Sequence, residues 1–134
     1  MVNSNRVESC RRLLKLPANW ALHFQQQVDS PLLIDKKGND IQVTYRYDAE
    51  AFRALLLLKE NAAKQDFHLS ETPRFAHDGV MVDCSRNGVP NLPALKRFIT
   101  NSALLGLDVL MGVAPVTLPV ESLTSVTATG NSSV

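Results

Sequence analysis

The stretch GVMVDCSRNGVPNLPALKRFITNSALLGLDVLM, residues 79–111, decides the fold of the C-terminal half of the chain. Residues 79–83 predict a buried strand, Asn91 is placed to cap a helix, and Gly106 lies where a left-handed residue ends one. A second apolar run at residues 107–111 then predicts another strand. Strand, helix and strand in this order indicate a βαβ unit with parallel strands.

In the predicted helix one mainly apolar face is shared by Leu92, Leu95, Phe98, Ile99 and Ser102. Two parallel strands and one helix leave a sheet with open edges and an uncovered face. The unit therefore looks like the beginning of a larger parallel structure, and we expect self-association through its unfinished surface.

Two helices are expected before the first predicted strand. Residues 6–16 have apolar side chains at helical spacing, and Pro17 closes the segment because its ring excludes continuation. Pro17 also opens a second predicted helix, in which Trp20, Phe24 and Val28 recur every four residues.

Residues 31–47 predict a hairpin whose loop, Asp35 to Asp40, contains Gly38 at a position that favours a positive φ. In its second strand we expect one packed face, made of Ile41, Val43, Tyr45 and Tyr47. Asp48 is then expected to cap a helix through about Ala63, in which Leu55 to Leu58 indicate burial on more than one side. A short strand through Phe67 and Leu69 completes an α/β unit, residues 1–76.

The composition excludes several classes of protein. With 14 basic and 13 acidic residues, a net charge of +1 attracts neither nucleic acid nor an anionic membrane. No apolar run approaches the roughly 20 residues that span a bilayer, and the first residues lack the apolar core of a signal peptide. Cys10 and Cys84 form neither a disulfide framework nor a zinc motif. We therefore expect a cytoplasmic protein of one ordinary domain, or of one small domain and part of a second.

Polar residues follow the strand at 79–83 directly. In parallel α/β folds, ligands bind outside the carboxyl ends of strands, so Asp83, Ser85, Arg86 and Asn87 are candidate site residues. The planar guanidinium of Arg86 suits adjacent sugar hydroxyls or a carboxylate. The alternative from spacing alone is a structural salt bridge between Arg86 and Asp83, and Asp83 alone would equally anchor nearby backbone N–H groups.

Other reactive side chains indicate structural roles. Cys84 needs a nearby base or cation to become a nucleophile, and a packed thiol is the simpler interpretation. His23, His68 and His77 are scattered without metal-ligand spacing. No phosphate loop, dinucleotide fingerprint or hydrolase elbow is present, so no cofactor or metal is predicted.

Residues 71–111, ETPRFAHDGVMVDCSRNGVPNLPALKRFITNSALLGLDVLM, resemble the entry into the catalytic TIM barrel of glycoside hydrolase family 20, the β-N-acetylhexosaminidases. Residues 1–70 resemble the α/β accessory domain before that barrel, most closely at FRALLLL. The resemblance implies an α/β accessory domain followed by the first βαβ unit, residues 77–111, of an incomplete (β/α)₈ barrel.

The same resemblance implies a role for two residues. Asp83 to Arg86 matches the Asp-x-x-Arg motif of the family, whose Arg hydrogen-bonds the hydroxyls of a terminal N-acetylhexosamine. The family hydrolyses its glycan by substrate assistance, with an adjacent Asp-Glu pair on a later strand. The present sequence has no Asp followed directly by Glu. We therefore expect an inactive fragment that retains a substrate-binding residue, Arg86, beside Asp83.

Residues 112–134 form an irregular tail without Lys or Arg. The family continues at this point with a stretch similar to Gly-Glu-Pro-Tyr-Phe-Gly-Tyr. Codons exist for Val120 to Gly130 that encode this stretch when read one base out of frame, so a frameshifted tail is our hypothesis. The alternative to the glycosidase fragment is a small non-enzymatic α/β module that binds a partner through the exposed face of residues 80–111.

Overall fold

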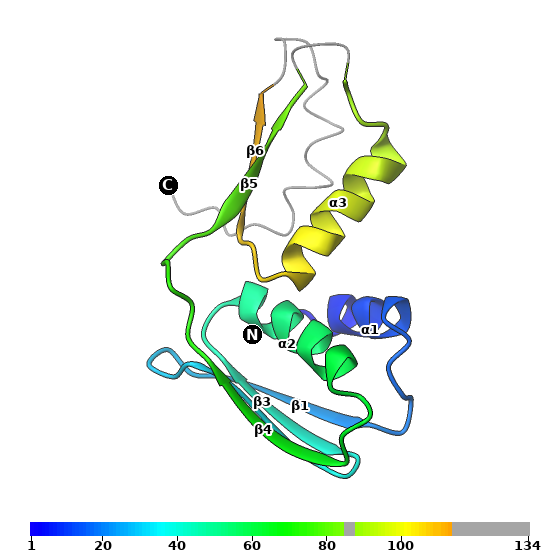
Figure 1. Ribbon diagram of the computed structural model, residues 1–134, viewed down its shortest axis with the longest axis vertical. Coiled ribbons are helices and arrows are strands. Elements are labelled where there is room, and N and C mark those ends of the chain that lie inside the picture. Colours follow the sequence, from blue (N-terminus) through cyan, green and yellow to red (C-terminus); the bar gives the residue numbers. More distant parts are fainter. Residues whose placement is uncertain (85–87, 114–134) are drawn as a thin grey trace. The chain divides into compact units, whose positions relative to one another are not determined.

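The computed structural model describes residues 1–84 and 88–113 (Figure 1). Over these residues the chain is a mixed α/β protein with three helices and two sheets. It divides into two units. The first comprises Met1–Ala76 with Ala103–Gly106, and the second comprises His77–Ser102 with residues 107–113. No helix in the described ranges is long and apolar enough to cross a membrane.

The first unit is a four-stranded sheet with helices on one face (Figure 1). The strands are ordered β1-β3-β2-β4, with β1 parallel to β3 and with β2 antiparallel to both of its neighbours. In chain order the elements are α1 (Ser4–Leu13), β1 (Ala21–Gln26), β2 (Leu32–Lys37), β3 (Asp40–Tyr45), α2 (Asp48–Glu60) and β4 (Asp66–Glu71).

The core of this unit lies between the central strands and α2. Strand alternation turns every second side chain of β2 and β3 toward the helices, and α2 meets them with side chains one turn apart. Each large apolar side chain buried in this way contributes roughly 1.5–3 kcal/mol. The fully buried residues are Leu32, Ile34, Ile41, Val43, Tyr45, Ala51, Ala54, Leu55 and Leu58.

The predicted helix at residues 17–28 is wrong, because β1 occupies Ala21–Gln26. A spacing of four residues fits a strand as well as a helix, since it is a multiple of two and close to 3.6. Trp20 is buried, and Leu22 and Phe24 are half-buried. The side chains that alternate with them are exposed. Val28, the third residue of the supposed stripe, lies beyond the strand and is exposed.

The predicted hairpin is present, with longer strands than expected. β2 continues to Lys37 and β3 begins at Asp40, so the loop is only Gly38 and Asn39, and Gly38 has the predicted positive φ of 57°. Tyr47 was expected on the packed face of the second strand. This expectation is wrong, because β3 ends at Tyr45 and Tyr47 is an exposed residue at the start of α2.

Helix α2 begins at Asp48 but is capped differently from the prediction. The carboxylate of Glu50 accepts hydrogen bonds from the backbone N–H groups of Arg46 (2.6 Å) and Tyr47 (3.4 Å). Glu50 is buried and reaches back to the residues before the helix, whereas Asp48 is exposed in the first turn. The helix ends at Glu60, three residues before the predicted end.

The second unit contains the predicted parallel βαβ arrangement. Strands β5 (Gly79–Asp83) and β6 (Val109–Val113) are parallel and are connected through α3 (Leu92–Leu104). The helix is followed by Gly106, whose φ of 87° is the predicted left-handed conformation. On the predicted apolar face of α3, Leu92 and Phe98 remain exposed, so this face is only partly covered.

Candidate functional site

The carboxyl end of β5 is the candidate site that the sequence predicts. Asp83 is the last residue of β5 and is exposed, and its register partner on β6 is Val113. Cys84 follows as a half-buried free thiol. Because the two strands are parallel, both carboxyl ends lie at the same edge of this small sheet. Arg86, with Ser85 and Asn87, lies outside the described residues.

The segment after Asp83 leads into a capped helix. The side chain of Asn91 accepts a hydrogen bond from the Ala94 N–H at 2.9 Å, and its carbonyl accepts one from the Leu95 N–H at 2.9 Å. Asn91 is therefore the helix cap that the sequence predicts. In the sequence, residues 84–91 lie between the end of β5 and the start of α3, and residues 85–87 among them are outside the described ranges.

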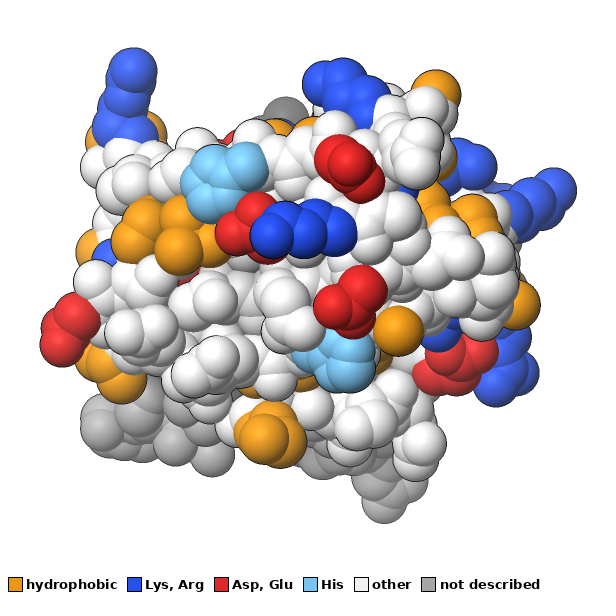
Figure 2. Space-filling model, turned by 90° about the horizontal axis from the view of Figure 1, so that it is seen from below, with side chains coloured by type: hydrophobic (Ala, Val, Ile, Leu, Met, Phe, Trp, Pro, Cys, Tyr) orange, Lys and Arg blue, Asp and Glu red, His pale blue; other side chains and the backbone are white. Residues whose placement is uncertain are grey.

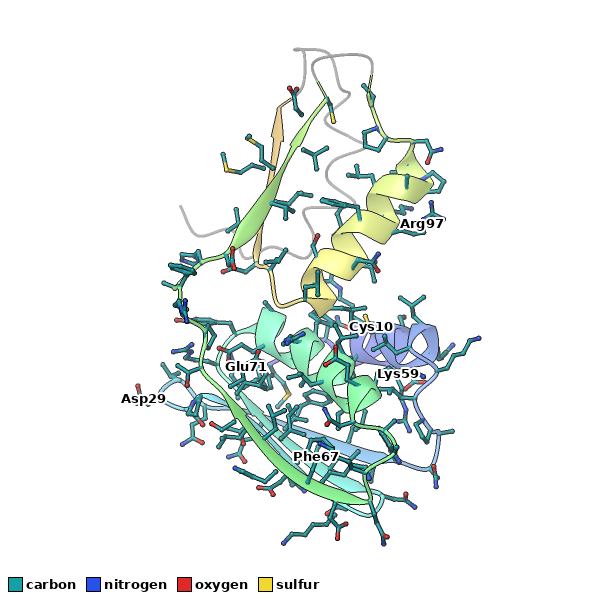
Figure 3. The ribbon with its side chains drawn as sticks, viewed as in Figure 1. Cys10, Asp29, Lys59, Phe67, Glu71 and Arg97 are labelled. Atoms are coloured by element: carbon teal, nitrogen blue, oxygen red, sulfur yellow. The ribbon has the colours of Figure 1, made fainter. Side chains whose placement is uncertain are left out.

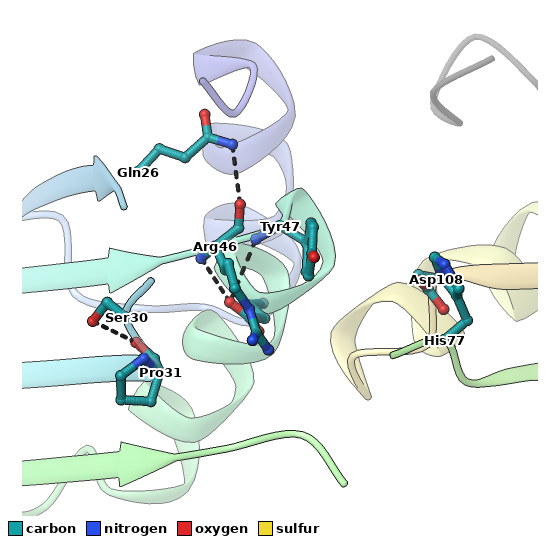
Figure 4. A network of polar contacts seen from close by, with 8 residues as sticks. Gln26, Ser30, Pro31, Arg46, Tyr47, His77 and Asp108 are labelled. Carbon is teal, nitrogen blue, oxygen red and sulfur yellow. Dashed lines mark hydrogen bonds and ion pairs between the residues drawn. The ribbon is translucent and has the colours of Figure 1, made fainter. Parts of the chain in front are cut away.

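The amino ends of β5 and β6 are joined by a polar cluster that sequence reasoning missed. His77 Nδ1 lies 2.6 Å from Asp108 Oδ2 (Figure 4). Asp108 Oδ1 accepts a hydrogen bond from the Asp78 N–H at 2.9 Å. Partial burial raises the pKa of Asp108, but hydrogen bonds from His77 and the Asp78 N–H, with the His77 charge, outweigh it and leave the pKa below its ordinary value of 3.8. This cluster fastens the end of the strand pair opposite to Asp83.

Gly79 permits the close approach of β5 to β6. A Cβ atom at this position would lie 2.3 Å from the carbonyl oxygen and 2.7 Å from the Cβ of Val109, its register partner. Both distances are shorter than any allowed contact, so only glycine fits without a shift of backbone. Gly79 is the first residue of β5, and Asp83 is the last residue of the same strand.

A second polar network lies in the first unit around Arg46 (Figure 4). Its guanidinium pairs with Glu50 at 3.0 Å and lies 5.1 Å from the centre of the Tyr47 ring, and its carbonyl accepts a hydrogen bond from Gln26 Nε2 at 3.0 Å. Within the described part of the chain, Arg46 Nε is buried without a hydrogen-bond partner. These contacts join the ends of the parallel strands β1 and β3 to the start of α2, which is a structural role.

The sheet of the first unit has an open, polar face (Figure 2). One row crosses all four strands in register, with His23 beside Gln42, Gln42 beside Asp35, and Asp35 beside His68. His68 Nδ1 lies 3.2 Å from Asp35 Oδ2, and His23 Nε2 lies 3.0 Å from Asp40 Oδ1. The two histidines and their two aspartate partners are each more than half exposed. Each pair is therefore a solvated surface contact that contributes little to stability.

Neither the histidines nor the cysteines form a site in the described ranges. His23 and His68 belong to the first unit and His77 to the second, and no group of three or more His, Cys, Asp or Glu residues there is arranged to hold a metal ion. Cys10 lies in α1, packed against the core (Figure 3), and burial raises the pKa of its thiol. A protonated, half-buried thiol is a poor nucleophile.

No protein-family model matches the chain, and no curated protein sequence matches it significantly. The assignment of a function therefore depends on the residues at the carboxyl end of β5 and on the arrangement that presents them.

Proposed function

We propose that this chain is a sugar-binding fragment of a β-N-acetylhexosaminidase of glycoside hydrolase family 20. It would consist of the α/β accessory domain and the first βαβ unit of the TIM barrel, and its ligand would be a glycan that ends in N-acetylhexosamine. The observation that carries the proposal is Asp83 at the carboxyl end of a strand that is parallel to the next strand and connected to it through a helix. Ligand-binding residues in barrels occupy this position.

The proposed ligand contact is Arg86, three residues after Asp83. A guanidinium presents several donors in a fixed plane, so it hydrogen-bonds two adjacent hydroxyls of one sugar ring. Asp83 would hold the start of this segment at the strand end and stand beside the sugar. The net charge of +1 suits a neutral glycan, because neither a strongly acidic nor a strongly basic surface is needed.

The 134 residues do not contain the groups that would break the glycosidic bond. Substrate-assisted hydrolysis in this family requires an acid and a neighbouring carboxylate that orients the acetamido group, and the sequence has no Asp-Glu pair. The proposed activity of this chain is therefore binding without turnover, in the cytoplasm.

The frameshift hypothesis for residues 120–130 is tested by the nucleotide sequence. The hypothesis expects codons that encode Gly-Glu-Pro-Tyr-Phe-Gly-Tyr in a neighbouring frame, followed by the remaining barrel strands in that frame. Codons that exclude this peptide, or a neighbouring frame without barrel strands, would remove the explanation.

The alternative is a small non-enzymatic module that binds a partner through residues 80–111. The exposed apolar side chains Met81 and Met111 favour it, because such side chains on a surface mark interaction sites. A module of this kind should be monodisperse and melt cooperatively, and it should show no preference for an amino sugar.

Two assays separate the proposals. A chromogenic N-acetylglucosaminide should be hydrolysed no faster by the purified chain than by buffer. In ligand-observed NMR, N-acetylglucosamine should bind weakly, with a Kd of about 1 mM as expected for one sugar ring held by few contacts, and glucose should bind less. Sustained hydrolysis contradicts the fragment proposal, and equal signals for both sugars favour the non-enzymatic module.

A further inference from the structure

We draw no further inference here: the strongest candidate, the open polar face of the four-stranded sheet on which His23 and His68 are each paired with an aspartate, carries nothing, because these pairs are solvated surface contacts and nothing in the described part of the chain shows what covers this face.

Discussion

The ammonium group of Lys36 lies over the ring of Trp20, with Nζ 5.1 Å from the ring centroid. The same Nζ donates hydrogen bonds to the carbonyl oxygens of Lys64 (2.7 Å) and Gln65 (2.6 Å). Lys36 is 4% exposed and projects from the core face of β2. It therefore ties the centre of the sheet to the segment between α2 and β4 and to the residue before β1.

Lys36→Ala should destabilise the first unit by about 2–4 kcal/mol, because it removes two hydrogen bonds from a charged donor and leaves a cavity beside Trp20. Trp20 is the only tryptophan, so urea unfolding followed by its fluorescence reports on this region. Lys37→Ala is the matched control on the same strand, where the side chain is exposed, and its effect should be within about 0.5 kcal/mol. Equal unfolding midpoints for the two variants would contradict the assigned role.

Gly79→Ala should weaken the pairing of β5 with β6, because the added methyl group would lie 2.3 Å from the Val109 carbonyl oxygen. The amides of β6 should then exchange with solvent faster than in the unchanged protein. Gly112→Ala is the control in the partner strand, since nothing lies within 4 Å of its added methyl group. Equal protection of the β6 amides against exchange in the two variants would contradict this role of Gly79.

Acid should loosen the amino ends of β5 and β6. The pKa of Asp108 is lower in the folded chain than its ordinary 3.8, so the folded state favours the carboxylate. Its contribution to stability is therefore fully present above about pH 4 and is lost as the pH falls through the lowered value. Hydrogen exchange of the Asp78 amide, whose N–H donates to Asp108 Oδ1, measures this loss when it is followed from pH 6 to pH 2.5.

Asp108→Asn should remove the acid-dependent change in hydrogen exchange of the Asp78 amide, and it should make this amide exchange faster at pH 6. Asp29→Asn is the control, at an exposed position in the first unit (Figure 3), and it should leave the pH dependence of exchange at the Asp78 amide unchanged. If exchange of the Asp78 amide depends on pH in the same way in the Asp108→Asn variant, the Asp108 carboxylate is not the source of that dependence.

The elements that depend on local chemistry could be predicted from the sequence. Gly106 ends the predicted βαβ helix with a positive φ, Asn91 caps it, and Gly38 turns the hairpin. Each of these depends on the conformational preference of one residue and on its near neighbours. The parallel pairing of β5 with β6 followed from the order of the elements alone.

The errors arose where distant segments decide the outcome. Residues 21–26 form a strand because they pair with β3, which is 19 residues further along the chain, and a four-residue apolar spacing does not reveal that pairing. The cap of α2 comes from Glu50 because burial turns its carboxylate back toward Arg46, whereas Asp48 remains in solvent.

The candidate site could be predicted only in part. Asp83 ends its strand as expected, because the change from apolar to polar residues marks that end. The need for Gly79 depends on how closely Val109 approaches, and the His77–Asp108 contact joins residues 31 positions apart. No local pattern contains either relationship.

Titration with N-acetylglucosamine of three proteins, the unchanged chain, Arg86→Ala and Arg97→Ala, tests the central claim most directly. Arg97 is the control because it is an exposed arginine of the same unit, on α3 (Figure 3). Loss of charge-assisted hydrogen bonds should weaken binding to Arg86→Ala about tenfold or more, while Arg97→Ala binds as the unchanged chain does. Equal affinity of Arg86→Ala and the unchanged chain for N-acetylglucosamine would contradict the account.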